Sequence, residues 1–169
     1  MNEHDGEIRI LAVCLGNICR SPTAHGVLQR KLEEAGLDGR VRVDSAGTGD
    51  YHIGKMPDPR AREAAAGRGY DLTGLRARQV EPDDFRRFHL ILAADTENYA
   101  DLVALAPSPA DRTKVRYLLD FAASPEQEVP DPYAESEEAF DRVLDLVEEA
   151  ADGLVEAVQT GEWIAHASA

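Results

Sequence analysis

The sequence places a cysteine and an arginine six residues apart around a short loop that contains a glycine. Cys14 follows the apolar run 8–13 (IRILAV), which is typical of a buried strand. Arg20 comes directly before Ser21 and Pro22, a pair that predicts a helix start with Ser21 as N-cap and Pro22 at the first helical position. A loop that runs from a strand end to a helix start points successive backbone N–H groups inward. Together with the positive end of the helix, these groups form a cradle for an anion.

These residue types in this order predict nucleophilic chemistry on a phosphate. A thiol beside a helix N-terminus and an arginine loses its proton easily, so Cys14 is the candidate nucleophile. The planar guanidinium of Arg20 can hold two phosphate oxygens in a bidentate fork. The hydroxyl of Ser21 either donates a hydrogen bond to the cysteine sulfur or only caps the helix, and a single hydroxyl can do both. Phosphoryl transfer to sulfur requires this combination of anion cradle, thiolate and arginine.

An aspartate held between two prolines is the candidate proton donor. Asp131 lies between Pro130 and Pro132, and a stiff loop of this kind suits a group that must meet a leaving oxygen. Taken alone, Asp131 fits an N-cap or a turn before the last helix better. Together with the cysteine loop, the role of proton donor becomes the better interpretation of Asp131, because phosphoryl transfer needs an acid for the leaving group.

Two tyrosines are candidates for the rim of the site. Tyr51 lies in a glycine-rich loop, where we expect an exposed and functional side chain. Tyr133 stands beside a proline, where packing is the commoner role of a tyrosine.

The rest of the sequence alternates between strand-like and helix-like segments, which predicts a single α/β domain over residues 1–169 with a parallel sheet flanked by helices in three layers. The expected strands are 8–13, 41–43, 90–94 and 115–119, with a loop at 45–49 closing the second. The expected helices are 22–36, 61–67, 98–105 and a long last helix with an apolar stripe from Phe140 to Val158. Short disordered ends are expected at about 1–6 and 162–169.

The composition is that of an ordinary globular chain, with 43% hydrophobic and 30% charged residues. A formal charge of −14 argues against broad binding to nucleic acid or to an anionic membrane. No apolar stretch is long enough to span a bilayer, and the acidic start is unlike a signal peptide, so we expect a cytoplasmic protein. Two cysteines are too few for a secreted disulfide scaffold, and no second Cys/His cluster could complete a zinc site with them. We therefore expect no metal or other cofactor.

The segment 14–22, CLGNICRSP, is similar, nearly letter for letter, to the signature of the low-molecular-weight protein tyrosine phosphatases of bacterial type. Asp131-Pro132-Tyr133 resembles the acid loop of that family. Further segments fall where similar ones fall in the family, namely 43–48, 57–60, 76–79 and 95–98. The resemblance runs from about Ile8 to the last helix.

The resemblance implies a four-stranded parallel sheet with helices on both faces, and a two-step, metal-free reaction through a phosphocysteine intermediate. In it Cys14 is the nucleophile, Arg20 clamps the phosphate, and Asp131 acts as general acid and then as base. Asn17 and Ser45 hydrogen-bond to keep the loop in its strained shape. The implied substrate-binding residues are Leu15, Gly16, Asn17, Ile18, Cys19 and Ser21. Tyr51 and Tyr133 would lie on either side of an aromatic ring of the substrate. The implied substrate is a phosphotyrosine protein, the implied product is inorganic phosphate, and the expected oligomeric state is a monomer or a weak dimer.

The second cysteine has two interpretations. Cys19 is either a small buried hydrophobe or a redox partner of Cys14, whose thiolate is the residue most exposed to oxidation. Any small apolar residue could fill the same volume, so packing alone does not demand sulfur. The resemblance favours the redox interpretation, because it implies a reversible disulfide between the two loop cysteines.

Two positions depart from the mammalian form of the family. His25 stands where that form has a glutamate, and Leu75 stands where it has the histidine that pairs with this glutamate. The hydrogen bonds that support Asn17 and Ser45 must therefore involve other partners. We assign His25 no catalytic role and expect a surface histidine on a helix.

Three other functions compete with phosphotyrosine hydrolysis. An arsenate reductase of this fold would need further cysteines, and the sequence has none after Cys19. In a protein-arginine phosphatase, the position of Ile18 tends to hold threonine, and an isoleucine packs better against an aromatic ring than beside a guanidinium. A non-catalytic phosphate-binding module would be expected to lack the nucleophile or the acid, and both are present.

Overall fold

The computed structural model describes residues 7–163. The ends at 1–6 and 164–169, where we expected disorder, lie outside the described residues.

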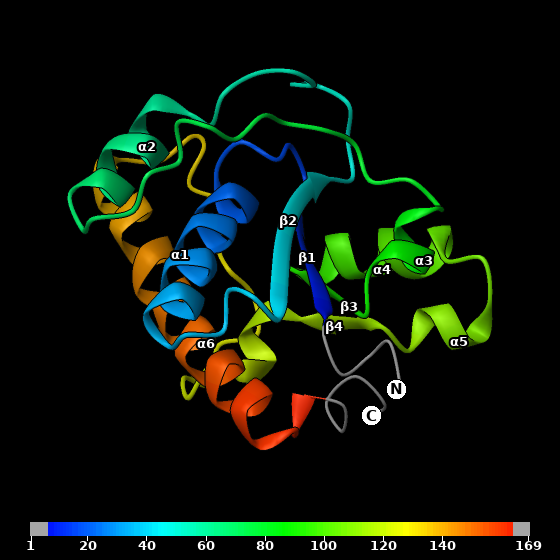
Figure 1. The fold of residues 1–169 in the computed structure, drawn as a ribbon. Coiled ribbons are helices and arrows are strands. Elements are labelled where there is room, and N and C mark those ends of the chain that lie inside the picture. Colours follow the sequence, from blue (N-terminus) through cyan, green and yellow to red (C-terminus); the bar gives the residue numbers. More distant parts are fainter. Residues whose placement is uncertain (1–6, 164–169) are drawn as a thin grey trace.

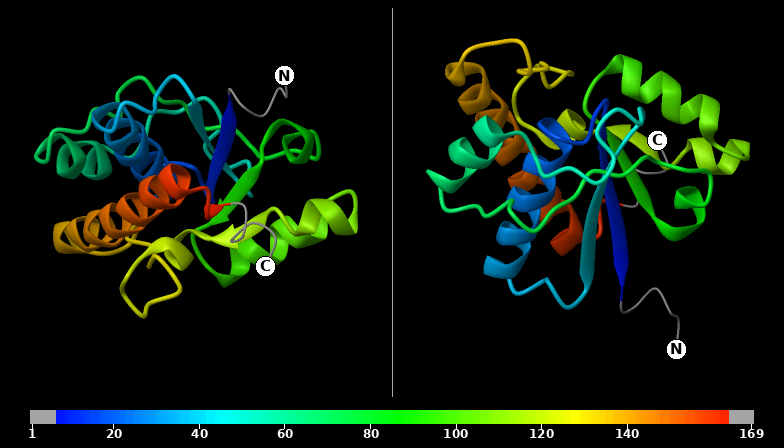
Figure 2. Two further views of the ribbon diagram at one scale, coloured as in Figure 1. Left: turned by 60° about the horizontal axis from the view of Figure 1, so that its bottom comes forward. Right: turned by 90° about the horizontal axis from the view of Figure 1, so that it is seen from above.

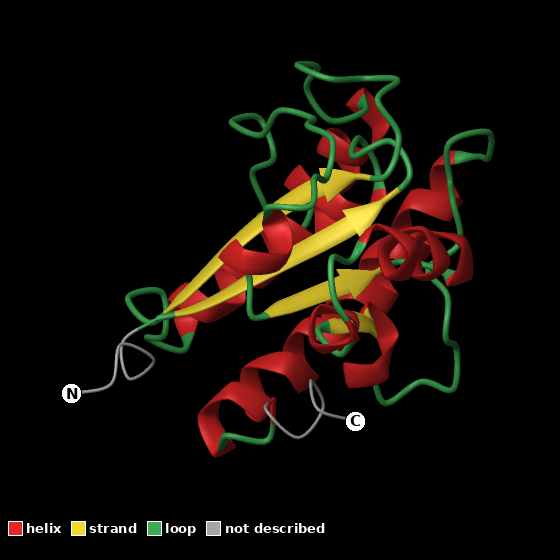
Figure 3. Cartoon of the chain, turned by 90° about the vertical axis from the view of Figure 1, so that its right-hand side faces the viewer, coloured by secondary structure: helices red, strands yellow, loops and turns green. Residues whose placement is uncertain are grey.

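Four parallel strands form one sheet in the order β2-β1-β3-β4 (Figure 1). They are β1 Ile8–Cys14, β2 Val41–Gly47, β3 Leu90–Ala93 and β4 Val115–Tyr117. Each strand pairs in parallel with its neighbour, as the arrows visible in Figure 3 also show, so the carboxyl ends of the strands share one edge. Cys14, the last residue of the inner strand β1, is paired with Gly47 of β2 at that edge.

Helices cover both faces of the sheet, with α1, α2 and α6 on one side and α3, α4 and α5 on the other (Figures 1 and 2). They are α1 Arg20–Glu34, α2 Pro59–Ala66, α3 Asp84–Arg87, α4 Thr96–Leu105, α5 Pro109–Arg112 and α6 Glu137–Thr160, with a 3₁₀ helix at Leu118–Phe121. The predicted three-layer α/β fold with a four-stranded parallel sheet is confirmed.

The apolar run of β1 explains this layering. Ile10 and Ala12 pack in the core beneath α1 and α6, whereas Leu11 and Val13 pack in the core beneath α3 and α4. A strand covered on both faces needs apolar residues at its covered positions, which is why 10–14 shows no alternation with polar residues, whereas Arg9 near the start of the strand is only partly buried.

The start of α1 corrects the predicted helix cap. The helix begins at Arg20 with Cys19 at the N-cap position, so Ser21 lies inside the first turn and Pro22 one residue further on. The hydroxyl of Ser21 does not cap the helix, because it faces the sulfur of Cys14 instead.

Further boundaries differ from the prediction, among them the ends of the second and fourth strands. Ser45 belongs to β2 and not to the loop after it, because pairing with β1 continues to Gly47. Leu119 lies in the 3₁₀ helix and not in the fourth strand, which ends at Tyr117. Helix α2 begins at Pro59, two residues earlier than predicted, because Asp58 is its N-cap and accepts a hydrogen bond of 2.8 Å from the Arg60 amide.

Candidate active site

The loop between β1 and α1 is held in a strained conformation by the side-chain amide of Asn17, which uses both its nitrogen and its oxygen. Asn17 has φ 56°, the left-handed region that non-glycine residues rarely adopt. Its Nδ2 donates to Ser21 Oγ at 2.7 Å, and its Oδ1 accepts from the Arg78 amide at 3.0 Å. A glycine is required beside the loop, because a Cβ on Gly47 would lie 2.7 Å from the carbonyl oxygen of Leu15.

Cys14 lies at the floor of the loop, with 3% of its surface exposed. Its Sγ is 3.1 Å from Ser21 Oγ and accepts a hydrogen bond from the Ser21 amide at 3.4 Å. The Ser21 hydroxyl also lies 3.3 Å from the carbonyl oxygen of Ala46. Because a hydroxyl has one proton, it can donate to the sulfur or to Ala46 but not fully to both. A charged sulfur is the stronger acceptor of the two.

Arg20 is buried at the start of α1 and is oriented by two residues outside the loop. Its Nη1 donates to Asp95 Oδ2 at 2.6 Å and to the Val129 carbonyl oxygen at 3.0 Å. Burial lowers the pKa of Arg20, but the negative groups around it, Cys14 and Asp95 foremost, outweigh that effect and raise the pKa overall. The guanidinium therefore stays charged, with one edge fixed and Nη2 directed toward Asp131, whose Oδ2 is 3.9 Å away.

Asp131 stands above this arginine on an exposed loop, with 48% of its side chain accessible. Its Oδ1 accepts a hydrogen bond from the Tyr133 amide at 3.1 Å, so the turn that its local sequence favours is also formed. It does not cap the last helix, because Ser136 occupies the N-cap position of α6.

A cavity of about 170 Å³ brings most of the predicted residues together. It is lined by Cys14, Leu15, Gly16, Ile18, Cys19, Arg20, Tyr51, His52, Asp131 and Tyr133. Tyr51 and Tyr133 stand at its mouth with 67% and 52% of their surfaces exposed. Asn17 and Ser21, which we expected among the substrate-binding residues, do not line it; their side chains bond to each other.

His52 is a lining residue that the sequence analysis missed. Its ring centroid lies 6.4 Å from that of Tyr51 and 6.3 Å from that of Tyr133, so it joins the two tyrosines. A side chain at Gly16 would approach His52 Cδ2 to 3.0 Å, which places the ring directly over the loop. A single histidine in an irregular loop carries no periodic signal from which this position could be predicted.

The prediction of a surface histidine at position 25 is wrong. His25 is only partly exposed, and its Nδ1 lies 3.1 Å from Ser45 Oγ. Burial lowers the pKa of His25, while the nearby Asp44 carboxylate acts in the opposite direction. Among the described residues, Ser45 and Asn17 share no hydrogen bond, and the Ser45 hydroxyl bonds to His25 on α1 instead.

An ion-pair network lies behind Asn17. The guanidinium of Arg78 bonds at 3.0 Å both to Asp44 and to Asp84, and Asp84 is completely buried. This arrangement fixes the Arg78 amide that donates to Asn17. The network joins β2 and α3 to the loop.

Cys19 packs in a small apolar cluster with Ile18, Ala61 and Phe140, and it lines the same cavity as Cys14. Burial, followed by the charge of Asp58, raises the pKa of the Cys19 thiol to about 12. Both cysteines are free thiols in this structure.

The described part of the chain holds no cluster of three or more His, Cys, Asp or Glu side chains that could bind a metal ion. Within residues 7–163, no helix combines the length and the apolar character needed to cross a bilayer.

The fold and the cavity together are of the kind found in cysteine-dependent phosphatases. Residues 9–162 match the sequence pattern of the family described as low molecular weight phosphotyrosine protein phosphatase. The chain belongs to this family, whose members are hydrolases, so the predicted family and enzyme class are confirmed.

Relatives and solved structures agree with this assignment. A putative low molecular weight protein-tyrosine-phosphatase of Synechocystis sp. is 43% identical over 88% of this chain and 94% of its own. A low molecular weight protein-tyrosine-phosphatase of Streptomyces coelicolor is 42% identical over 89% and 93%. The crystal structure of a protein tyrosine phosphatase from Entamoeba histolytica superposes with a TM-score of 0.89 at 37% identity, covering 92% of this chain and 99% of that one.

Proposed function

We propose that this protein hydrolyses phosphotyrosine in protein substrates, and simple aryl phosphates, through a phosphocysteine on Cys14. The observation that carries the proposal is the position of the Cys14 sulfur. It lies at the floor of the cavity with two donors from Ser21 on it, and Arg20 and Asp131 line the same space.

In the first step, the Cys14 thiolate attacks phosphorus, the S–P bond forms and the bond from phosphorus to the tyrosyl oxygen breaks. The free edge of Arg20 and the loop amides hold the phosphate oxygens, because Nη1 is already fixed by Asp95. The carboxyl group of Asp131 gives its proton to the leaving oxygen.

In the second step, the Asp131 carboxylate takes a proton from a water molecule, whose oxygen attacks phosphorus. The S–P bond breaks, inorganic phosphate leaves, and the returning thiolate of Cys14 accepts a hydrogen bond from Ser21. Neither step requires a metal ion or a redox change.

The depth of the cavity supports an aromatic substrate. Cys14 is almost completely covered, and two exposed tyrosines, Tyr51 and Tyr133, rise beside the opening. A flat side chain can pass between them and reach the sulfur, and ring contacts with the tyrosines would add affinity. Ile18, on the wall, offers an apolar surface and no hydrogen-bonding side chain to a guanidinium.

Parallel assays of three peptides test this function. The purified protein is given phosphotyrosine, phosphoserine and phosphoarginine peptides without metal, with vanadate as inhibitor control and Cys14→Ser as the matched variant. We expect phosphate release from phosphotyrosine alone, blocked by vanadate and absent in the variant. Faster release from phosphoarginine would overturn the substrate assignment, and full activity of Cys14→Ser would overturn the nucleophile.

A further inference from the structure

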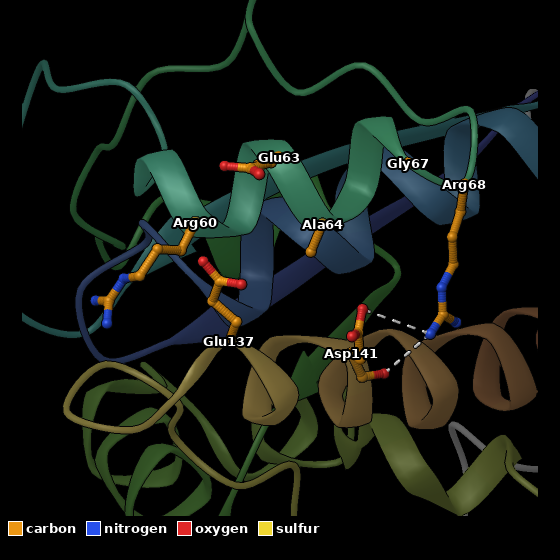
Figure 4. A pocket seen from close by; sticks show the side chains of 7 residues that line it. All are labelled: Arg60, Glu63, Ala64, Gly67, Arg68, Glu137 and Asp141. Atoms are coloured by element: carbon orange, nitrogen blue, oxygen red, sulfur yellow. Dashed lines mark hydrogen bonds and ion pairs between the residues drawn. The ribbon is translucent and has the colours of Figure 1, made fainter.

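Arg60, in the first turn of α2, points toward the loop that carries Asp131. Figure 4 shows a surface groove between α2 and the start of α6, with Arg60 at one end and Arg68 at the other. The two arginines extend in different directions: Arg60 runs toward the loop before α6, and Arg68 runs onto α6 itself.

The guanidinium of Arg60 binds the loop 130–136 at two points. Its Nη2 donates to the Tyr133 carbonyl oxygen at 2.7 Å and its Nη1 donates to that of Glu135 at 3.3 Å. The group also lies 5.7 Å from the centre of the Tyr133 ring and 4.7 Å from that of Phe140. Leaving aside the start of α6, these are the two hydrogen bonds that join 130–136 to other elements within residues 7–163.

The other side of Arg60 is fixed to the cysteine loop. Asp58 receives Arg60 Nε at 3.1 Å and Nη2 at 3.0 Å in a bidentate pair. The Asp58 amide in turn donates to the carbonyl oxygen of Ile18 at 2.8 Å. Besides the 3.9 Å ion pair between Arg20 and Asp131, the acid loop is therefore connected to the phosphate-binding loop by hydrogen bonds through the Arg60–Asp58 pair.

The backbone of Tyr133 links Arg60 to the carboxylate of Asp131. Its carbonyl oxygen accepts from Arg60, and its N–H donates to Asp131 Oδ1 at 3.1 Å. We propose that Arg60 is a positioning residue for the proton-transfer step: it holds the acid loop so that Asp131 faces Cys14 and Arg20. This proposal rests on the proposed function, because it assumes that Asp131 protonates the leaving group.

Loss of the anchor should weaken proton transfer more than phosphate binding. Displacing a catalytic group by about 1 Å can cost on the order of 100-fold in rate. We expect Arg60→Ala to lower kcat/KM by about 10- to 100-fold for phenyl phosphate, whose leaving group needs a proton, and by less than about threefold for 2,4-dinitrophenyl phosphate, which does not. Arg60→Lys, which keeps the charge but not the fork, should fall between Arg60→Ala and the wild type. Inhibition by inorganic phosphate should stay unchanged.

Arg68→Ala is the matched control. Arg68 carries the same charge from the other end of the groove and binds Asp145 at 3.0 Å and Glu148 at 2.7 Å on α6, away from the acid loop. Its removal should leave the ratio between the two substrates at the wild-type value. Equal ratios in Arg60→Ala and Arg68→Ala would overturn the proposal.

A double-mutant cycle with Asp131→Asn separates positioning from general structural damage. If Arg60 acts through Asp131, adding Arg60→Ala to Asp131→Asn should change kcat/KM for phenyl phosphate by less than about twofold. A full additional loss would refute the proposal.

Amide hydrogen exchange over 130–136 tests the anchor independently of activity. Arg60→Ala should speed exchange there and Arg68→Ala should not. If Asp131→Asn shows no preference between leaving groups, the acid assignment under the proposed function fails. Unchanged exchange in Arg60→Ala would instead remove the anchoring role itself.

Discussion

Replacing Ser21 by alanine should slow the breakdown of the phosphoenzyme and leave its formation nearly intact. The Ser21 hydroxyl lies 3.1 Å from Cys14 Sγ, where it can donate to the thiolate that leaves in the second step. A hydrogen bond to a charged group contributes about 1.5–3 kcal/mol, which corresponds to a fall in kcat of about 10- to 150-fold. The same bond stabilises the attacking thiolate before the first step, so kcat/KM should change much less.

Rapid-mixing kinetics with p-nitrophenyl phosphate measure the difference between the effects on kcat and on kcat/KM. Ser21→Ala should show a burst of p-nitrophenol followed by a slow steady state, with phosphoenzyme trapped by acid quench. Thr23→Ala is the matched control, because Thr23 places a buried hydroxyl in the same helical turn but donates to the Cys19 carbonyl oxygen at 2.7 Å. Ser21 also accepts from Asn17, so inhibition by inorganic phosphate is measured to detect a distorted loop. Equal falls in kcat and kcat/KM with no burst would refute the reasoning.

Arg20→Lys should lose nearly as much kcat/KM as Arg20→Ala, because a lysine cannot bind Asp95 and present a planar fork to phosphate together; retention of most activity toward a phosphotyrosine peptide would show that charge alone suffices. Burial lowers the pKa of His25 in the folded state, so the unfolded chain binds the proton more readily. The free energy of unfolding should therefore decrease as the pH falls from the ordinary pKa of 6.5 toward the lowered pKa of the folded state. Urea unfolding of His25→Gln should show a flatter profile there, and an unchanged slope would contradict this. Mild peroxide should inactivate the enzyme through a Cys14–Cys19 disulfide that a thiol reductant reopens; mass spectrometry that finds Cys14 over-oxidised beside a free Cys19 thiol would leave Cys19 with packing alone.

The parts of the site that lie together in the sequence could be predicted from it. Six residues of the segment 14–20 line the cavity, and the strand-loop-helix unit that carries them is recognisable because its residue types and its two boundaries are all local. Even here the cap was misplaced. A serine after a loop is normally an N-cap, and the pattern cannot show that a neighbouring sulfur competes for its hydroxyl.

The contacts that orient these residues join segments far apart in the sequence. The Arg78 amide reaches Asn17 across 61 positions, and Arg60 reaches Tyr133 across 73. Such pairs meet only because the sheet order β2-β1-β3-β4 brings the loops after several strands to one edge. Neither helical nor strand periodicity contains that order, so the sequence predicts the reacting groups better than the groups that hold them.

The change at positions 25 and 75 shows how the support around the loop is rebuilt. Leu75 packs against the apolar core and offers Ser45 no polar partner. His25, one turn after Ser21 on α1, reaches Ser45 at 3.1 Å instead. The hydrogen bond therefore comes from α1, the helix that also contains Ser21 and begins with Arg20, so β2 is fixed directly to the helix whose first residue lines the cavity. Because burial lowers the pKa of His25 and so favours its neutral form, this link between α1 and β2 is a hydrogen bond between neutral groups.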